Sequence, residues 1–169
     1  MHFMAKFLIT GFMGSGKSSL LLELKKSKEL KKFKFLDLDE CIELDQQESI
    51  NEIVSRKGIE FFRKIENTHL EALILSSDDC IIALGGGALH LESWATIAAN
   101  KVQLIWIDTP FEVCLSRIKR EGDKRPLSKL SKEELYSLYE QRCKYYKKAQ
   151  FRTTGETEEL IQFITSSTI

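Results

Sequence analysis

The sequence predicts an α/β fold with three layers, in which helices cover both faces of a central parallel sheet of about five strands. Three observations lead to this prediction. Short apolar segments alternate with amphipathic ones along the chain, which is the order of a strand–helix repeat. Each of the first four apolar segments ends in glycine or a polar residue, as strands do at the ligand-binding edge of such sheets. The length of 169 residues suits a single domain over 1–169.

The strands are predicted where the apolar segments are short and bounded by polar or glycine residues. The third of them ends in a run of three glycines, and the last is the shortest. Their side chains are apolar almost throughout, which is typical of strands buried on both faces. The predicted strands cover residues 5–10, 33–39, 80–87 (with its glycine turn), 102–108 and 150–154.

Helices are predicted between and after these strands, where apolar residues recur at helical spacing. The longest helical region is interrupted near Gly58, and Pro110 suits the first turn of the helix that follows it. A polar stretch at 119–134 has no apolar periodicity, and 119–131 is predicted to be a mobile lid. The predicted helices cover residues 18–26, 49–75, 92–100, the segment after 110, 132–148 and 156–166.

Composition argues against several classes of protein. Twenty-five basic residues balance twenty-five acidic ones, whereas nucleic-acid binders usually carry a basic excess. The local excess of six lysines at Lys25–Lys34 is interpreted as a solvated helix end and loop. The four cysteines form no CxxC pair, which indicates reduced thiols in a cytosolic protein. No signal peptide or membrane-spanning segment is predicted.

The strongest motif is Gly11–Ser18, which fits the P-loop pattern G-x-x-x-x-G-K-[ST]. Glycines let successive backbone N–H groups wrap closely around a polyphosphate. The helix that begins near Lys17 adds the positive end of its dipole. Lys17 can reach the β- and γ-phosphates, and the Ser18 hydroxyl can bind Mg²⁺. Because the motif follows a buried strand and opens a helix, the sequence predicts a nucleoside-triphosphate site.

Two further motifs carry charge. Asp37 and Asp39 are two residues apart, so in a strand their side chains would share a face. One carboxylate could serve the water shell of Mg²⁺ and the other a substrate hydroxyl, or both could be solvated acids at a strand end. Arg63 and Glu66 are neighbours on one helical face. They could belong to a binding site, or they could form an exposed ion pair that contributes little to stability.

Two more motifs could approach a ligand. Gly85–Gly87 follows a buried strand and permits close approach of the backbone to a ligand, although a plain tight turn fits as well. Arg125 lies in the polar stretch and could close over a phosphate, or it could belong to an ordinary surface loop.

Taken in order, these motifs resemble those of the shikimate kinases. The order is GxxGxGKS, D-x-D, FRxxE, GGG, RPL and R-x-x-x-Y, and the resemblance extends from Lys6 to about Phe163. It implies a P-loop fold like that of the nucleoside monophosphate kinases. It also implies Mg²⁺-dependent transfer of the γ-phosphate of ATP to the 3-hydroxyl of shikimate, in aromatic amino-acid biosynthesis. The lid departs from the family because it is slightly short and reads Arg-Pro-Leu-Ser, where a second leucine is usual.

The resemblance also implies roles for single residues. ATP phosphates would lie on the P-loop, Ser18 and Asp37 would serve the metal, and Asp39 would bind the shikimate hydroxyls and assist their deprotonation. Lys17 and Arg125 would act in catalysis, and Arg120 would lie under the adenine. The residues implied to bind ATP are Gly14, Ser15, Gly16, Lys17, Ser18, Ser19, Arg120 and Arg125. Those implied to bind shikimate are Asp39, Arg63, Glu66, Gly85, Gly86, Gly87 and Arg142.

Two other functions stay open from the residues alone. One is a kinase of another small hydroxylated acid, such as gluconate, because Arg63 and Arg142 favour a carboxylate without specifying the ring. The other is a nucleotide-binding module that uses the P-loop as a switch. The presence of Asp39 and Arg125 disfavours it, because a switch needs neither an acid that binds an acceptor nor an arginine in a lid. The expected partners are ATP and shikimate, with no nucleic acid and no membrane, and the expected state is a monomer in the cytoplasm.

Overall fold

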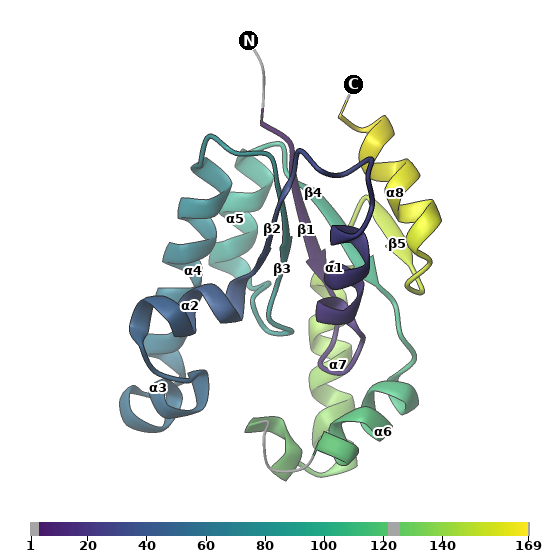
Figure 1. The fold of residues 1–169 in the computed structure, drawn as a ribbon. Helices are drawn as coiled ribbons and strands as arrows, with labels where there is room; N and C mark the ends of the chain where they lie inside the picture. Colours follow the sequence, from purple (N-terminus) through teal and green to yellow (C-terminus); the bar gives the residue numbers. More distant parts are fainter. Residues whose placement is uncertain (1–3, 122–125, 169) are drawn as a thin grey trace.

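The computed structural model describes residues 4–121 and 126–168, and its centre is a parallel sheet of five strands (Figure 1). The strands lie in the order β2-β3-β1-β4-β5, so that β1 is flanked by β3 and β4. All four pairings are parallel, which confirms the predicted sheet. The strands are β1 (Lys6–Thr10), β2 (Lys34–Asp37), β3 (Cys80–Ala83), β4 (Gln103–Ile107) and β5 (Phe151–Thr153).

Helices cover both faces of this sheet, as a buried parallel sheet requires. Phe7 and Ile9 of β1 point to one face, where they pack with α1 and α8. Leu8 points to the other face, into a larger core shared with the remaining helices. This alternation along β1 produces the predicted three layers. The helices are α1 (Lys17–Lys25), α2 (Leu38–Gln46), α3 (Ile50–Lys57), α4 (Ile59–Leu75), α5 (Leu91–Ala99), α6 (Phe111–Glu121), α7 (Lys132–Tyr146) and α8 (Thr157–Ser166).

Local sequence explains where several helices begin. The predicted helical region at 49–75 is divided at Gly58, whose φ of 85° interrupts the helix between α3 and α4. Capping boxes open α3 and α7, where Ser49 pairs with Glu52 and Ser131 with Glu134. Between α6 and α7, the described part of the predicted lid includes a 3₁₀ helix, η2 (Pro126–Lys129).

The segment after β2 differs from the prediction. The strand ends at Asp37, and α2 begins at Leu38, a helix that the sequence analysis did not predict. Asp37 is the N-cap of this helix, and its Oδ1 accepts hydrogen bonds from the backbone nitrogens of Asp39 and Glu40 at 3.0 and 3.4 Å. The argument that Asp37 and Asp39 share a face of a strand is therefore wrong. The two carboxylates come together through a helix cap instead.

The strand ends bring the remaining motifs to one edge of the sheet. Because β1 and β3 are parallel and in register from Lys6 opposite Cys80, their carboxyl ends lie side by side. The P-loop follows β1, and the glycine turn, Gly85–Gly87, follows β3. This is the edge where open parallel sheets bind ligands.

Candidate active site

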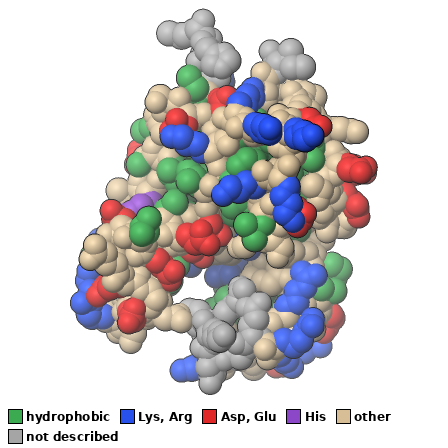
Figure 2. Space-filling view, in the orientation of Figure 1, with side chains coloured by type: hydrophobic (Ala, Val, Ile, Leu, Met, Phe, Trp, Pro, Cys, Tyr) green, Lys and Arg blue, Asp and Glu red, His purple; other side chains and the backbone are tan. Residues whose placement is uncertain are grey.

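A cleft of about 630 Å³ lies at this edge of the sheet. The space-filling view shows a hollow in the molecular surface, below the acidic side chains near the centre of the picture (Figure 2). The P-loop forms one wall, and Asp37, Asp39 and the glycine turn border it. Arg117 of α6 and the loop after β5 complete the wall. The cleft is lined by Met13, Gly14, Ser15, Gly16, Lys17, Ser18, Ser19, Leu20, Glu23, Asp37, Asp39, Leu84, Gly85, Gly86, Ile107, Arg117, Gly155 and Thr157.

The P-loop backbone has the conformation that its glycines permit. Gly14 and Gly16 have φ angles of 78° and 100°, in the region that favours glycine. Space is a second constraint, because a Cβ atom on Gly14 would lie 2.9 Å from the Cys114 carbonyl oxygen. The amino group of Lys17 donates to the carbonyl oxygens of Gly11 and Phe12 at 2.8 and 3.0 Å, so its side chain folds along the loop.

Two side chains hold P-loop carbonyl groups from outside. Arg117 Nη1 donates to the Gly14 oxygen at 2.8 Å, and the buried Thr109 hydroxyl donates to the Ser15 oxygen at 2.9 Å. Because the N–H of each trans peptide points opposite to its C=O, holding the Ser15 carbonyl turns the Gly16 N–H the other way. These contacts hold the peptide groups in the orientation in which their N–H groups can donate to a polyphosphate.

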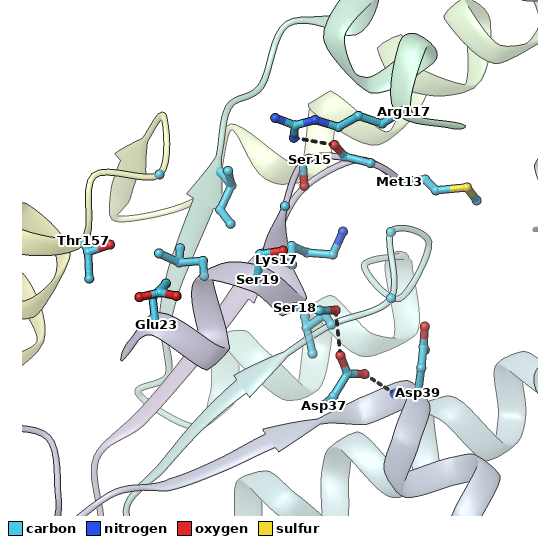
Figure 3. Close-up of a pocket in the computed structure, with 18 residues that line it drawn as sticks. Met13, Ser15, Lys17, Ser18, Ser19, Glu23, Asp37, Asp39, Arg117 and Thr157 are labelled. Atoms are coloured by element: carbon cyan, nitrogen blue, oxygen red, sulfur yellow. Dashed lines mark hydrogen bonds between the residues drawn. The ribbon is translucent and has the colours of Figure 1, made fainter. Parts of the chain in front are cut away.

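On the opposite side of Lys17, Ser18 and Asp37 face each other (Figure 3). The Ser18 hydroxyl donates to Asp37 Oδ2 at 3.1 Å. Both are oxygen ligands of the kind Mg²⁺ prefers, and a magnesium ion beside a nucleotide takes its remaining ligands from phosphates and water. In the described part of the chain, no three His, Cys, Asp or Glu side chains gather as a metal site. The Ser18 hydroxyl and the Asp37 carboxylate, 3.1 Å apart, supply two oxygen atoms of the kind that suits Mg²⁺.

The glycine turn packs against four charged side chains. A Cβ atom on Gly85 would lie 2.9 Å from Asp39 Oδ1 and 3.2 Å from Glu66 Oε1. On Gly87 it would lie 2.8 Å from Arg142 Nη2 and closer still to Arg63. The turn thus brings two acids and two arginines together, although Arg63, Glu66 and Arg142 do not line the cleft itself.

Several polar atoms at this place are buried and have no hydrogen-bond partner among residues 4–121 and 126–168. They include Asp39 Oδ1, Glu66 Oε1 and Arg142 Nη1. Arg63 Nη1 donates to the other Glu66 oxygen at 2.5 Å, and Glu66 itself is only 1% exposed. Buried polar atoms in proteins are normally satisfied, so this group of atoms indicates a polar ligand or ordered water.

Burial also shifts the pKa values of these groups. Burial and the nearby Asp37 carboxylate raise the pKa of Asp39 to about 6, against the opposing effect of Lys17. Burial raises the pKa of Glu66, which the Arg63 guanidinium opposes. Burial lowers the pKa of the Arg142 guanidinium. An acid with a raised pKa in a cleft, beside a phosphate-binding loop, is typical of a group that accepts a proton.

Not every predicted residue lies in the cleft. Arg120 is exposed and does not line it, whereas Arg117, one helical turn earlier on α6, does. Arg125 lies outside the described residues. Gly155 and Thr157 line the cleft but were not predicted from the sequence. The signal for them was their position after the last predicted strand, at the same edge of the sheet as the P-loop.

Two other predictions concern the chain as a whole. All four cysteines are free thiols, as predicted. Within residues 4–121 and 126–168, the helices are too short or too polar to span a membrane.

Comparisons with known proteins agree on one family. The family model for shikimate kinase matches residues 13–169. A shikimate kinase of Persephonella marina is 34% identical over 95% of both chains, and one of Dictyoglomus turgidum is 37% identical over 80% of this chain and 78% of its own.

Solved structures give the same result. The crystal structure of shikimate kinase from Aquifex aeolicus superposes with a TM-score of 0.78 at 34% identity, over 96% of this chain and 95% of its own. A shikimate kinase from Acinetobacter baumannii, solved with shikimate, has a TM-score of 0.84 at 24% identity over 99% and 97%, and supports the fold. The chain therefore belongs to the shikimate kinase family.

Proposed function

We propose that this cleft holds ATP on the P-loop and shikimate against the glycine turn, and that the γ-phosphoryl group passes to the 3-hydroxyl of shikimate. The observation that carries this proposal is the convergence of Asp39, Arg63 and Arg142 on the turn beside the P-loop. A small acid with several hydroxyl groups needs cationic side chains to bind its carboxylate and a carboxylate side chain to accept hydrogen bonds from its hydroxyls. The glycine turn brings both kinds of side chain together.

ATP would bind with its phosphates on Gly14–Ser19, where the peptide orientation held by Thr109 and Arg117 supplies N–H donors. Lys17 would move from the loop carbonyls to the β- and γ-phosphates, which are stronger acceptors. The nucleoside would extend toward Arg117 and Thr157, which lie away from Asp39 across the P-loop (Figure 3), and toward Gly155, which lines the same cleft. We therefore propose Arg117 for the nucleotide contact that the family resemblance suggested for Arg120.

Mg²⁺ would be held by the Ser18 hydroxyl and, directly or through water, by Asp37. When bound, it would neutralise negative charge on the phosphates. Asp37 also caps α2, so the carboxylate that serves the metal fixes the start of the helix that carries Asp39. The Asp37 carboxylate and the backbone of Asp39 are thereby linked directly.

Asp39 would receive the proton of the attacking hydroxyl. Its buried Oδ1 has no hydrogen-bond partner in the described part of the chain and faces the glycine turn, where the acceptor would lie. Burial raises its pKa toward the range in which a carboxylate takes a proton more readily than a solvated acid does. As the hydroxyl oxygen attacks, Lys17 would stabilise the charge on the transferred group. We keep for Arg125 the same role, as the arginine of a closing lid.

The shikimate carboxylate would lie between the guanidinium groups of Arg63 and Arg142. Glu66 holds Arg63 by a short ion pair on the next turn of α4 and leaves the rest of that guanidinium available. The absence of side chains on Gly86 and Gly87 leaves the room that both arginines occupy. The single domain, the monomeric state and the cytoplasmic location stay predictions from the sequence.

Arg117 and Arg120 offer a matched pair of variants. Arg117→Ala is expected to raise the KM for ATP about tenfold, because it removes a charged hydrogen bond to the P-loop and a cleft-lining cation. Arg120→Ala removes the same kind of side chain from an exposed position on the same helix and should leave that KM within about twofold. Steady-state kinetics with ATP varied would measure both, and equal effects would contradict the assignment.

The position of phosphoryl transfer is tested on the product. Phosphorus and proton NMR of the reaction mixture should show a single phosphate ester, coupled to the proton on carbon 3 of shikimate. An ester at another carbon would keep the kinase activity and overturn the proposed orientation of the substrate.

A further inference from the structure

Tyr146, at the end of α7, is a fully buried polar side chain to which the proposed mechanism gives no role. It belongs to the R-x-x-x-Y motif, lies four residues after Arg142, and is 1% exposed. Residues four apart on a helix are neighbours, so the ring lies beside the arginine. The ring also packs against Trp106 of β4, with 6.1 Å between ring centroids. This packing places the Tyr146 hydroxyl next to the glycine turn.

The hydrogen bonds of this hydroxyl have a defined direction. A tyrosine hydroxyl has one proton to donate, and Tyr146 donates it to the carbonyl oxygen of Gly86. The oxygen can then act only as an acceptor toward its other neighbour, the Arg142 guanidinium, whose charge it interacts with. Burial raises the pKa of Tyr146, so the hydroxyl keeps its proton and this direction. The Tyr146 hydroxyl thus interacts with both the Arg142 guanidinium and the Gly86 carbonyl oxygen.

The other surroundings of Arg142 leave one part of it unsatisfied. The guanidinium lies over the ring of Phe12, 5.5 Å from its centroid, so the ring bounds the group on one side. Nη1 is buried and has no hydrogen-bond partner among the described residues. A Cβ atom on Gly86 would lie 3.2 Å from this nitrogen, so the turn passes directly beside it. Arg142 thus lies between the Phe12 ring, the glycine turn and the Tyr146 side chain.

We infer that Tyr146 is a positioning residue, whose hydroxyl holds the Arg142 guanidinium at the angle needed to bind the shikimate carboxylate through Nη1. The inference rests on the proposed function, because it takes Arg142 to be a carboxylate ligand. Tyr146 itself does not touch the substrate in this account. Its effect on shikimate binding passes through Arg142, and this dependence can be measured.

The experiment is a double-mutant cycle on the affinity for shikimate. Tyr146→Phe removes one oxygen and keeps the ring against Trp106, and it should raise the KM for shikimate about tenfold. The KM for ATP and the melting temperature should change little. Tyr145→Phe is the matched control, because it makes the same change on the adjacent residue, whose hydroxyl has no hydrogen bond to the described residues. The cycle is completed by Arg142→Ala, alone and combined with Tyr146→Phe.

The inference predicts that Tyr146→Phe has no further effect once Arg142 is gone, so the double variant should match Arg142→Ala within about twofold. It would be overturned if Tyr146→Phe raised the KM for shikimate as much in the Arg142→Ala background as in the native one. It would also be overturned if the single variant changed that KM less than twofold, or changed both KM values equally. An unchanged KM for shikimate in Arg142→Ala alone would instead refute the proposed carboxylate site, and this inference with it.

Discussion

Replacing Asp39 by asparagine is expected to lower kcat roughly 100- to 1000-fold, while the protein stays folded and binds ATP as before. The amide is the same size as the carboxylate but cannot take a proton from the attacking hydroxyl. The backbone nitrogen of Asp39, which donates to Asp37, is unaffected by the change, so α2 should keep its start. Rapid-quench or coupled measurements of turnover, together with calorimetric titration of ATP, would separate chemistry from binding.

Glu40 supplies the control for this variant. It is the next residue on α2, its side chain is exposed, and Glu40→Gln makes the same chemical change at a distance from the turn. We expect native turnover from Glu40→Gln. If Asp39→Asn also turned over at a near-native rate, the acid would have no part in proton transfer, and the mechanism would need another base.

Arg142→Ala should raise the KM for shikimate about 100-fold and change the KM for ATP much less. Loss of the guanidinium removes a charged hydrogen-bond donor whose buried Nη1 has no partner within the residues that the structure describes. Charged hydrogen bonds contribute about 1.5–3 kcal/mol. The remaining Arg63 would then hold the carboxylate alone. Steady-state kinetics with each substrate varied in turn would measure the two constants.

Lys144→Ala is the control, because Lys144 is an exposed cation on the same helix. It should leave both constants near their native values. Equal increases in the two KM values of Arg142→Ala would contradict the carboxylate role and indicate a general loss of structure in α7.

The P-loop and the glycine turn could be predicted because their sequences reflect backbone requirements. Gly14 has a φ of 78°, which the loop backbone requires and which glycine adopts readily. That requirement is local, so a pattern of glycines after an apolar strand is enough to identify it. Gly87 leaves room for two arginines from distant helices, and the run of glycines marks the place without showing which side chains fill it.

The acid pair was predicted for the wrong reason. Alternation along a strand puts Asp37 and Asp39 on one face, yet the strand ends at Asp37 and the helix begins at once. The same two residues meet because an aspartate is a good N-cap and its own cap partner is the backbone of Asp39. The apolar residues around Asp37 favoured a longer strand, so its role as an N-cap was not predicted.

The choice between Arg117 and Arg120 depends on tertiary packing. Both lie on α6, three residues apart, and both are near the predicted lid. Which of them meets the P-loop depends on how α6 rotates as Cys114, Leu115 and Ile118 enter the core. Local sequence does not determine that rotation, because it results from contacts with distant strands and with α7.

The central claim is that shikimate is the phosphoryl acceptor at this cleft. The most direct test is ADP release by the purified protein with ATP and Mg²⁺, measured with and without shikimate and with gluconate in its place. The account predicts rapid ADP release with shikimate, a small background without an acceptor, and no increase with gluconate. ADP release that does not depend on shikimate, or that gluconate stimulates equally, would contradict it.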